Sequence, residues 1–419
     1  MGRAGEMIHP VYASMQTTVF EAMSGLAREL GAINLGQGFP DDQGPPELIE
    51  AAARALREKS NQYPPSAGLP ELRDAVCAFY RRRQGLALAR EQAIVTSGAT
   101  EAIADAVLAL VQPGDEVILF QPAYDAYAPM VRRAGGVPVS VGLRPPAWTY
   151  EAEALAAAIT PKTRVLMLND PLNPAGTAAS EVELAAIAEL CAGHDLIAIS
   201  DEVWEEVRFD GVIHRSLMSF PGMAERTVKI GSAGKIFGLT GWKCGWMIAA
   251  PELAMGLAGA HQFNTFTSPP ALQWAVAEGL ALPDAWFAAR DAGWAASRER
   301  LRRGLEGAGF VVLPNAATWF LCVDLAASGI GLGDREFSER AIREAGVASI
   351  PVSALFEGDG PGHVVRFCFT KPDSMLDEAV ARLEEFRRGL PPSPSGEGFF
   401  SITPAPAPHR YPLRSGARQ

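Results

Sequence analysis

Short apolar runs of strand type alternate with longer helical patterns along most of this chain, and that alternation constrains the fold more than any other feature. The runs read AIVTSG, EVILF, RVLMLND, LIAISDE, TVKIGS and CGWMIAA, and helical patterns such as SEVELAAIAELCAGHD lie between them. Strands separated by helices pair in parallel, because the chain must cross over before it returns to the sheet. The sequence therefore predicts an α/β fold with a mostly parallel sheet flanked by helices.

The pattern changes after about residue 285, where helix, strand, helix and strand read RDAGWAASRERLRRGLEGAG, TWFLCVDL, REFSERAIREAG and VVRFCF. A chain of 419 residues also exceeds one ordinary hydrophobic core. We therefore expect a large domain over 46–285 and a smaller α+β domain over 286–390, which an N-terminal arm, 1–45, joins. The stretch 391–419 is rich in Pro, Gly and Ser and is predicted to be disordered.

Charge and cysteine usage exclude several classes of function. The chain has 37 Lys and Arg against 48 Asp and Glu, a formal net charge of −11, and no basic block indicates a nucleic-acid surface. The five cysteines are scattered without a CxxC pair, which is typical of a reducing cytoplasm and offers no zinc-like spacing. No stretch reads as a secretory signal or a membrane span. Small-molecule chemistry in the cytoplasm is the favoured interpretation.

The first polar signal at a strand end is the motif TSGATEAIADAVLAL. Four residues follow the strand and open a helix that carries Glu101 in its first turn: Ser97, Gly98, Ala99 and Thr100. Free backbone N–H groups and the helix dipole make such a turn suitable for holding a phosphate. An ordinary strand–turn–helix with a threonine cap is the alternative for this motif alone.

Two further signals stand at strand ends. In LNDPLNPAGT, Asn173 lies between prolines in a rigid turn that can aim its amide, although a plain Asn-Pro turn is the alternative. In IAISDEVWEE, an apolar strand ends in Asp201 and Glu202. A buried carboxylate needs a cationic partner, so Asp201 predicts a positive group opposite it. Because open α/β sheets bind ligands at the carboxyl ends of their strands, these side chains are expected to share one site.

Lys235 stands in GSAGKIFGLTGWKCGW, directly after the strand-like run RTVKI and among small residues that leave room for a flat cofactor. A lysine in a desolvated site has a depressed pKa and can attack a carbonyl as a free amine, forming a Schiff base. A solvated surface lysine is the alternative for any one lysine. A phosphate cradle, an acid for a pyridinium nitrogen, an amide donor and a lysine together predict pyridoxal 5′-phosphate as the cofactor.

In this combination the sequence resembles the class I, fold-type I aminotransferases, and within them the kynurenine/glutamine and methionine aminotransferase-like group. The similarity runs from about Val11 to Leu390 and is carried, in order, by INLGQGFPDDQGPPEL, NQYPPSAGLPELRDAV, TSGATEAI, QPAYDAYAPM, NDPLNPAGT, ISDEVW, GSAGKIFGLTGWKCGW and VVRFCF. The resemblance implies a homodimeric, pyridoxal-phosphate-dependent enzyme of amino acid metabolism. It would move an amino group from an amino acid to a 2-oxo acid by a ping-pong mechanism.

The resemblance also implies a role for each residue around the cofactor ring. Lys235 would bind the cofactor as a Schiff base and move the proton between substrate and cofactor. Asp201 would keep the pyridine nitrogen protonated, so that the ring accepts the electron pair left at the substrate Cα. Asn173 would donate a hydrogen bond to the 3′ oxygen, and Tyr124 would stack on the ring.

The two anionic ends of the bound molecules would have their own ligands by the same resemblance. The phosphate would be bound by the turn and the lysine motif, that is by Ser97, Gly98, Ala99, Thr100, Ser232 and Lys243. Tyr63 of the partner subunit would reach the phosphate across a dimer interface. Arg366 would grip the substrate carboxylate as a bidentate fork, helped by the backbone of Gly38.

The chain departs from the family at Trp204, where a tyrosine usually helps to bind the 3′ oxygen. An indole donates one hydrogen bond but cannot accept one or ionise, so Trp204 is expected to contact cofactor and substrate chiefly as a hydrophobic wall. Trp319 likewise stands where relatives often have tyrosine. With Phe39 and Phe266 around the entrance, these rings predict an apolar, aromatic or sulfur-containing amino donor, and no second arginine for a distal carboxylate is evident.

Other functions stay open at this stage. A pyridoxal-phosphate-dependent carbon–sulfur β-lyase would use the same lysine and the same proton abstraction, and would differ by losing a leaving group from Cβ. A non-catalytic, cofactor-binding regulator would need a fused winged helix, and we expect none before Val11. A dinucleotide-dependent dehydrogenase is disfavoured, because Asp41 takes the place of the third glycine in LGQGFPDD.

Overall fold

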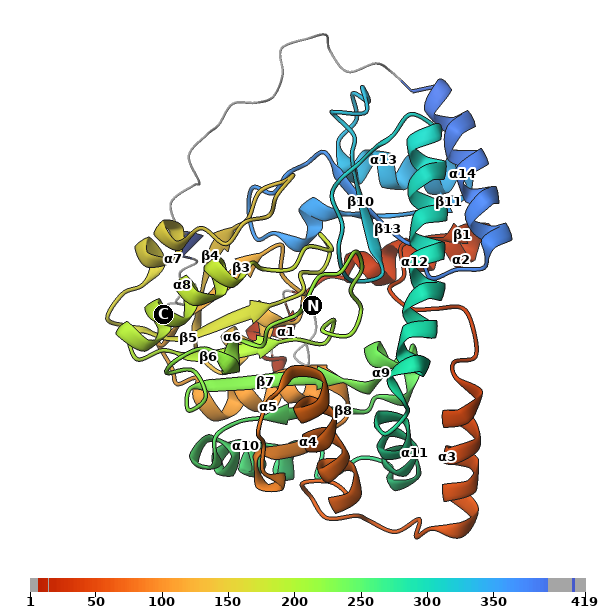
Figure 1. The fold of residues 1–419 in the computed structure, drawn as a ribbon. Helices are drawn as coiled ribbons and strands as arrows, with labels where there is room; N and C mark the ends of the chain where they lie inside the picture. The colour runs from red at the N-terminus through yellow and green to blue at the C-terminus, as the bar shows by residue number, and fades with distance from the viewer. Residues whose placement is uncertain (1–6, 14, 391–408, 411–419) are drawn as a thin grey trace.

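An eight-stranded sheet forms the centre of the computed structural model, which describes residues 7–13, 15–390 and 409–410 (Figure 1). From edge to edge the strands are β14 (His409–Arg410), β4 (Val137–Gly142), β3 (Glu116–Gln121), β5 (Thr163–Asn169), β6 (Ile197–Asp201), β7 (Thr227–Ser232), β8 (Gly245–Ile248) and β2 (Ala93–Thr96). The strands from β4 to β7 are parallel, whereas β8, β2 and β14 are antiparallel to their neighbours. The predicted mostly parallel sheet is confirmed.

Helices cover both faces of this sheet because its strands are apolar on both sides. In β3, Val117 and Leu119 pack toward α5 (Gly98–Leu110) and α6 (Tyr127–Arg133). The alternate residues Ile118 and Phe120 pack toward α7 (Ala152–Ala158) and α8 (Glu181–Gly193). Successive side chains of a strand point to opposite faces. A strand with four consecutive buried apolar residues must therefore lie between two helical layers.

Further helices pack on the sheet or beside the helices that cover it. α4 (Pro70–Gln84) and α11 (Pro270–Leu280) pack on the β2–β8 end of the sheet, with α3 (Pro46–Glu58) beside α11 and α10 (Pro251–Asn264) beside α5. α12 (Asp284–Gly307) is 24 residues long. Figure 1 shows it running along one side of the molecule, from the second sheet toward α11 and α3.

A second, antiparallel sheet lies above the first, and the N-terminal segment forms a separate two-stranded sheet with a strand from the C-terminal part of the chain. The order of the antiparallel sheet is β12 (Ile350–Pro351), β13 (Val364–Cys368), β10 (Phe320–Asp324) and β9 (Val311–Val312), and α13 (Asp334–Arg340) and α14 (Asp373–Arg388) pack with it. β1 (Ile33–Asn34) pairs in parallel with β11 (Val347–Ala348), and α2 (Val19–Leu30) lies beside both. Figure 1 shows these N-terminal elements beside the C-terminal ones.

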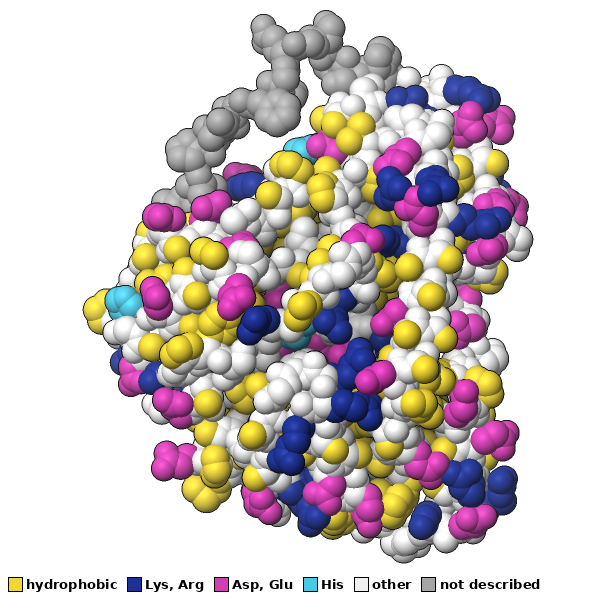
Figure 2. Space-filling model, viewed as in Figure 1, with side chains coloured by type: hydrophobic (Ala, Val, Ile, Leu, Met, Phe, Trp, Pro, Cys, Tyr) yellow, Lys and Arg dark blue, Asp and Glu magenta, His cyan; other side chains and the backbone are white. Residues whose placement is uncertain are grey.

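The surface and the tail add two facts. Figure 2 shows basic and acidic side chains interspersed over the visible face. No helix in the described part of the chain is long and apolar enough to cross a membrane. The predicted disordered stretch 391–419 lies outside the described residues, except for the two that form β14 and pair with β4.

Candidate active site

A cavity of about 560 Å³ opens where the parallel strands end below the second sheet, and most of the residues predicted from the sequence line it. They are Gly38, Gly98, Ala99, Thr100, Tyr124, Asn173, Asp201, Trp204, Ser232, Lys235, Lys243 and Arg366. Two predicted residues lie outside it. The backbone N–H of Ser97 donates to the Glu101 carboxylate, and Tyr63 is 83% exposed, with its ring against Phe266.

Lys235 enters the cavity from α9 (Ala233–Ile236), which begins directly after β7. Gly234 is needed there, because a Cβ at that position would lie 3.1 Å from the Cα of Thr240. Burial lowers the pKa of Lys235 to about 8, against the opposite effects of Cys368 and Asp201. The amine is therefore available in its neutral form closer to physiological pH than a surface lysine is.

Asp201 stands at the last position of β6 and faces the cavity floor. Its Oδ2 accepts a hydrogen bond from the Tyr127 hydroxyl, and its backbone carbonyl accepts one from Asn169 Nδ2 at 3.0 Å. Burial raises the pKa of Asp201 to about 6, although the donation from Tyr127 acts in the other direction. A carboxylate held in this way is strongly favoured to pair with a positive ligand atom.

Arg366 projects from β13 and closes the opposite side of the cavity. Its Nη1 donates to Asn173 Oδ1 at 3.0 Å, and its Nη2 donates to the Gly36 carbonyl at 2.5 Å. The guanidinium lies 3.9 Å from the centroid of the Phe320 ring, and its Nε is buried without a partner. Burial lowers the pKa of Arg366 to about 10, which leaves the group charged at neutral pH.

The N-terminus of α5 forms the third wall. Its N-cap side chain makes no capping hydrogen bond, so the first backbone N–H groups of this 13-residue helix face the cavity with the dipole behind them. A Cβ at Gly98 would come within 3.3 Å of Lys243 Nζ, which places that ammonium beside the helix end. Gly245 lets β8 approach, because a Cβ there would lie 2.9 Å from the Gly98 carbonyl carbon.

These walls fit pyridoxal 5′-phosphate and an amino acid together. The α5 N-terminus with Lys243 suits a phosphate, Asp201 suits a pyridinium nitrogen, and Lys235 offers an amine. The buried, unpartnered Nε of Arg366 suits a carboxylate, since a bidentate pair would satisfy it. The groups that would bind the two anions stand on separate sides of one cavity.

Several lining residues were not found from the sequence. Tyr127 stands three positions after Tyr124 in QPAYDAY, and Asn169 ends the strand before the Asn173 turn. Phe20 and Phe320 come from α2 and β10. The motif with two tyrosines and the polar end of RVLMLN were available signals, but which tyrosine meets Asp201 depends on the strand order.

Trp204 and Phe39 line the cavity, as expected of donor-facing rings, whereas two other expected rings lie elsewhere. Trp319 is fully buried behind Trp204, with the two rings perpendicular and their centroids 4.9 Å apart. Phe266 lies at the surface beside Tyr63. Of these four rings, only Trp204 and Phe39 can touch a substrate within this chain's own cavity.

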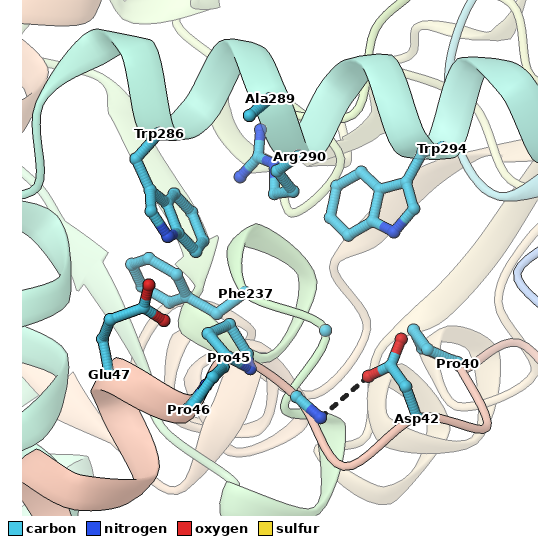
Figure 3. Close-up of a pocket in the computed structure, with 12 residues that line it drawn as sticks. Pro40, Asp42, Pro45, Pro46, Glu47, Phe237, Trp286, Ala289, Arg290 and Trp294 are labelled. Atoms are coloured by element: carbon cyan, nitrogen blue, oxygen red, sulfur yellow. Dashed lines mark hydrogen bonds between the residues drawn. The ribbon is translucent and has the colours of Figure 1, made fainter.

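A second cavity, of about 310 Å³, is lined by residues of α12 and of the segments around Pro40 and Phe237 (Figure 3). Figure 3 shows Trp286, Arg290 and Trp294 of α12 above it, with Pro40, Pro45 and Phe237 below. The Arg290 guanidinium makes its hydrogen bonds within the protein: it donates to the backbone carbonyls of Ile236 and Glu206 and to the Asp291 carboxylate.

Two buried clusters of acids with a histidine could in principle hold a metal within the described residues, but each already contains a cation. The Lys229 ammonium donates to both Glu202 and Glu205, and His214 Nε2 lies 2.7 Å from Glu202. In the other cluster, the nearby carboxylates of Asp105 and Glu101 outweigh the effect of burial and raise the pKa of His261 to about 10.

Comparison with known proteins gives a consistent result. The sequence profile of the family described as aminotransferase class I and II matches residues 31–383. The methionine aminotransferase of Escherichia coli is 38% identical over 371 residues, covering 88% of this chain and 96% of the relative. Kynurenine–oxoglutarate transaminase 1 of Rattus norvegicus is 34% identical over 400 residues, covering 87% and 95%.

Solved structures agree with these relatives. The structure of N-succinyldiaminopimelate aminotransferase from Mycobacterium tuberculosis superimposes with a TM-score of 0.87 at 45% sequence identity. The match covers 90% of this chain and 99% of that one. The second sheet and the long helix beside it are therefore part of a shared architecture.

Proposed function

Since the chain belongs to the class I and II aminotransferases, as its motifs indicated, we propose that it transfers the amino group of an apolar, aromatic or sulfur-containing amino acid to a 2-oxo acid. The proposed cofactor is pyridoxal 5′-phosphate, which this family uses. One observation carries the proposal. A half-buried lysine, a buried aspartate and a buried arginine whose Nε has no partner line one cavity beside a helix N-terminus that lacks a side-chain cap.

When bound, the cofactor supplies a carbonyl for an amine and a ring that takes up the electron pair left at the substrate Cα. Asp201 would hold the proton on the ring nitrogen by charge pairing, and Tyr127 would fix the orientation of that carboxylate. Lys235 would take the proton from Cα and return it, since its lowered pKa makes the neutral amine accessible. Arg366 would orient the substrate through its carboxylate.

The proposed donor class rests on the cavity wall. Arg366 is the one arginine that lines it among the described residues. The aromatic rings that line it are Phe20, Phe39, Trp204 and Phe320. A side chain with a distal carboxylate would need a second cation, and Lys243 stands at the phosphate end. We therefore favour thioether and aromatic donors.

A second candidate donor is N-succinyldiaminopimelate, because a structural neighbour at 45% identity bears that name. A panel of purified amino donors with 2-oxoglutarate and other 2-oxo acids separates the two candidates. We expect methionine, phenylalanine or kynurenine to give a higher kcat/KM than N-succinyl-L,L-diaminopimelate. The opposite order would overturn the donor class and leave the aminotransferase assignment intact.

The carbon–sulfur β-lyase alternative is tested in the same experiment. S-aryl cysteines incubated without a 2-oxo acid would release pyruvate and a thiol if the leaving group departs from Cβ. We expect this release to be slower than transamination of the preferred donor.

We also propose the organisation that the sequence indicated. The large domain would span 46–285 and the small one 286–390, with 1–45 as the arm. A homodimer in the cytoplasm would bring Tyr63 of the partner subunit to each phosphate site, which is supported by the exposure of this ring and of Phe266 beside it. All five cysteines are free, as suits a reducing compartment.

A further inference from the structure

The amine of Lys235 lies in a corner between two indole rings. Its Nζ is 4.8 Å from the ring centroid of Trp204 and 5.2 Å from that of Trp319. Both distances are within the range in which an ammonium is attracted to an aromatic face. Within the described part of the chain the amine makes neither a hydrogen bond nor an ion pair, so the two rings are its nearest partners.

Both rings are fixed by their own packing. Trp204 is 3% exposed and Trp319 is fully buried, and the two meet edge to face at 83°. Phe320 packs on Trp204 from the second sheet, with centroids 5.3 Å apart. The indole N–H of Trp319 is buried without a partner, so the contact that this ring offers Lys235 is its face.

A third indole supports the pair from behind. Trp294 of α12 packs on Trp319 at 5.4 Å between centroids and 72° between planes. Figure 3 shows Trp294 at the edge of the second cavity, on the same helix as Trp286. Three packed indoles therefore connect α12 with the lysine, in the order Trp294, Trp319, Trp204. Trp319 cannot move away from Lys235 without displacing Trp294 and its helix.

The charged and ionisable groups that face Lys235 do not replace these contacts. Asp201 of β6 and Cys368 at the end of β13 raise its pKa, whereas Arg366 of β13 and Lys243 lower it. None of the four lies within hydrogen-bond or ion-pair distance of Nζ. The two indole rings are therefore in direct contact range of the Lys235 amine, whereas these four charged or ionisable groups act on it from farther away.

We propose that Trp204 and Trp319 form an aromatic cradle that binds the protonated amine of Lys235 and holds it in place when the lysine is not attached to the cofactor. Both are positioning residues for that lysine. The proposal rests on the proposed function for its catalytic meaning. A lysine that is released once in each half-reaction must stay beside the substrate Cα, and two ring faces would hold its ammonium in place between taking the proton and returning it.

The cradle and a plain hydrophobic wall predict opposite changes in pKa. If the ring faces stabilise the ammonium, then a smaller, less electron-rich ring stabilises it less and the pKa of Lys235 falls. If the indoles only exclude water, then a smaller ring admits water and the pKa rises toward the ordinary value of a lysine. The sign of the change therefore decides between the two.

The test measures the pKa of Lys235 in the full-length chain after the cofactor has been removed with hydroxylamine. The rate of labelling by a neutral acylating reagent is followed against pH, and the peptide that contains Lys235 is quantified by mass spectrometry. We expect Trp204→Phe and Trp319→Phe each to lower this pKa by about half a unit. Trp148→Phe, a buried indole of another core cluster whose N–H also lacks a partner, should leave it unchanged.

Replacement of all 8 tryptophans by 5-fluorotryptophan gives a second measurement that keeps ring shape and therefore folding. Fluorine weakens the ring face, so the pKa should again fall. A rise, or no change, in the fluorinated protein or in the folded phenylalanine variants would overturn the cradle. The labelling needs no cofactor, so a protein that failed to bind pyridoxal 5′-phosphate would refute the proposed function without affecting this result.

Discussion

Arg366 shows at the scale of one residue how the site is prepared for a substrate. Two of its donors are bonded to Asn173 and to the Gly36 carbonyl, and its Nε is buried without a partner. An unsatisfied buried donor costs free energy that a ligand carboxylate would recover. The residue is therefore held in a conformation that leaves its Nε–H free for a ligand carboxylate.

Replacing this residue by lysine keeps the charge and removes the planar fork. We expect Arg366→Lys to lower kcat/KM about a hundredfold, or about 2–3 kcal/mol in transition-state binding. Arg382→Lys, an exposed arginine of α14 that pairs with Glu378, serves as the control and should change little. Unchanged kinetics of Arg366→Lys for every amino acid in the panel would mean that another residue binds the carboxylate.

Asp201 carries a cost in stability that comes from the same burial. Its pKa is about 6 in the folded chain, above the ordinary value of 3.8. Ionisation therefore opposes folding: the cost is absent below about pH 4, grows between pH 4 and 6, and is constant above pH 6. We expect Asp201→Asn to stabilise the cofactor-free protein at pH 8 by up to about 3 kcal/mol and to abolish transamination.

Urea unfolding of the two cofactor-free proteins at pH 4.5 and pH 8 checks this prediction. The difference in free energy of unfolding should be small at the lower pH and large at the higher one. A difference of the same size at both values would show that ionisation of Asp201 is not its source.

Sequence reasoning reached the residues whose chemistry is local and missed those that depend on the fold. Asp201 ends its strand, and Lys235 and Asn173 come within about one helical turn of a strand end, so their place at the sheet edge could be predicted. Tyr127 could not be assigned to Asp201, because their contact needs β3 and β6 in one sheet with α6 above it. Ser97 was placed at the phosphate, but its N–H is taken by Glu101.

At the scale of elements, His261 ties three segments together at the phosphate end. It lies on α10, its Nδ1 is 2.7 Å from the Glu101 carboxylate on α5, and its Nε2 is 2.8 Å from the carbonyl of Ser66. The hydrogen bond with Glu101 and the nearby carboxylate of Asp105, whose Oδ2 is 3.6 Å from Nδ1, raise its pKa to about 10 in spite of burial. The imidazolium thus holds the start of α5 against the segment that carries Tyr63.

Because the folded pKa of His261 lies above that of the unfolded chain, its contribution to stability is complete below about pH 6.5. It is lost as the pH rises through about 10. We expect His261→Gln to lose about 1–3 kcal/mol of stability at pH 6 and much less near pH 10. His363→Gln, at an exposed histidine, is the control for urea unfolding at both pH values. A loss that does not depend on pH would contradict the charged state.

The position of a strand could be predicted where the sequence has a continuous apolar run. Strands without such a run were not predicted. The strands over 93–96, 116–121, 163–169, 197–201, 227–232 and 245–248 coincide with the runs read from the sequence. β4 was not among them, because VPVSVG carries a proline and polar residues in a strand near the sheet edge. The pairing of β1 with β11 joins residues more than 300 positions apart, which no local pattern reveals.

At the scale of the whole molecule, side chains from the large sheet and from the second sheet line one cavity, and Tyr63 lies outside it. α2, β10 and β13 supply its roof, and the large sheet with α5 and α9 supplies its floor. Tyr63 is 83% exposed although it carries a large ring. A dimer that covered this face would bury that ring.

We expect Tyr63→Phe to weaken retention of the cofactor about tenfold without unfolding the protein, because one hydrogen bond to a charged phosphate would be lost. Dissociation is followed by dialysis and visible absorbance, and light scattering reports the oligomeric state. Tyr12→Phe, at another exposed tyrosine, is the matched control. A fully active monomer would refute both the dimer and the role of this hydroxyl.

The central claim is that Lys235 is the covalent attachment point of pyridoxal 5′-phosphate, and borohydride reduction tests it most directly. Purified protein reconstituted with the cofactor is reduced, digested and mapped by mass spectrometry. We expect a yellow protein that loses its visible band on reduction and carries the cofactor mass on the peptide that contains Lys235. Attachment at Lys243, or at no lysine, would contradict it.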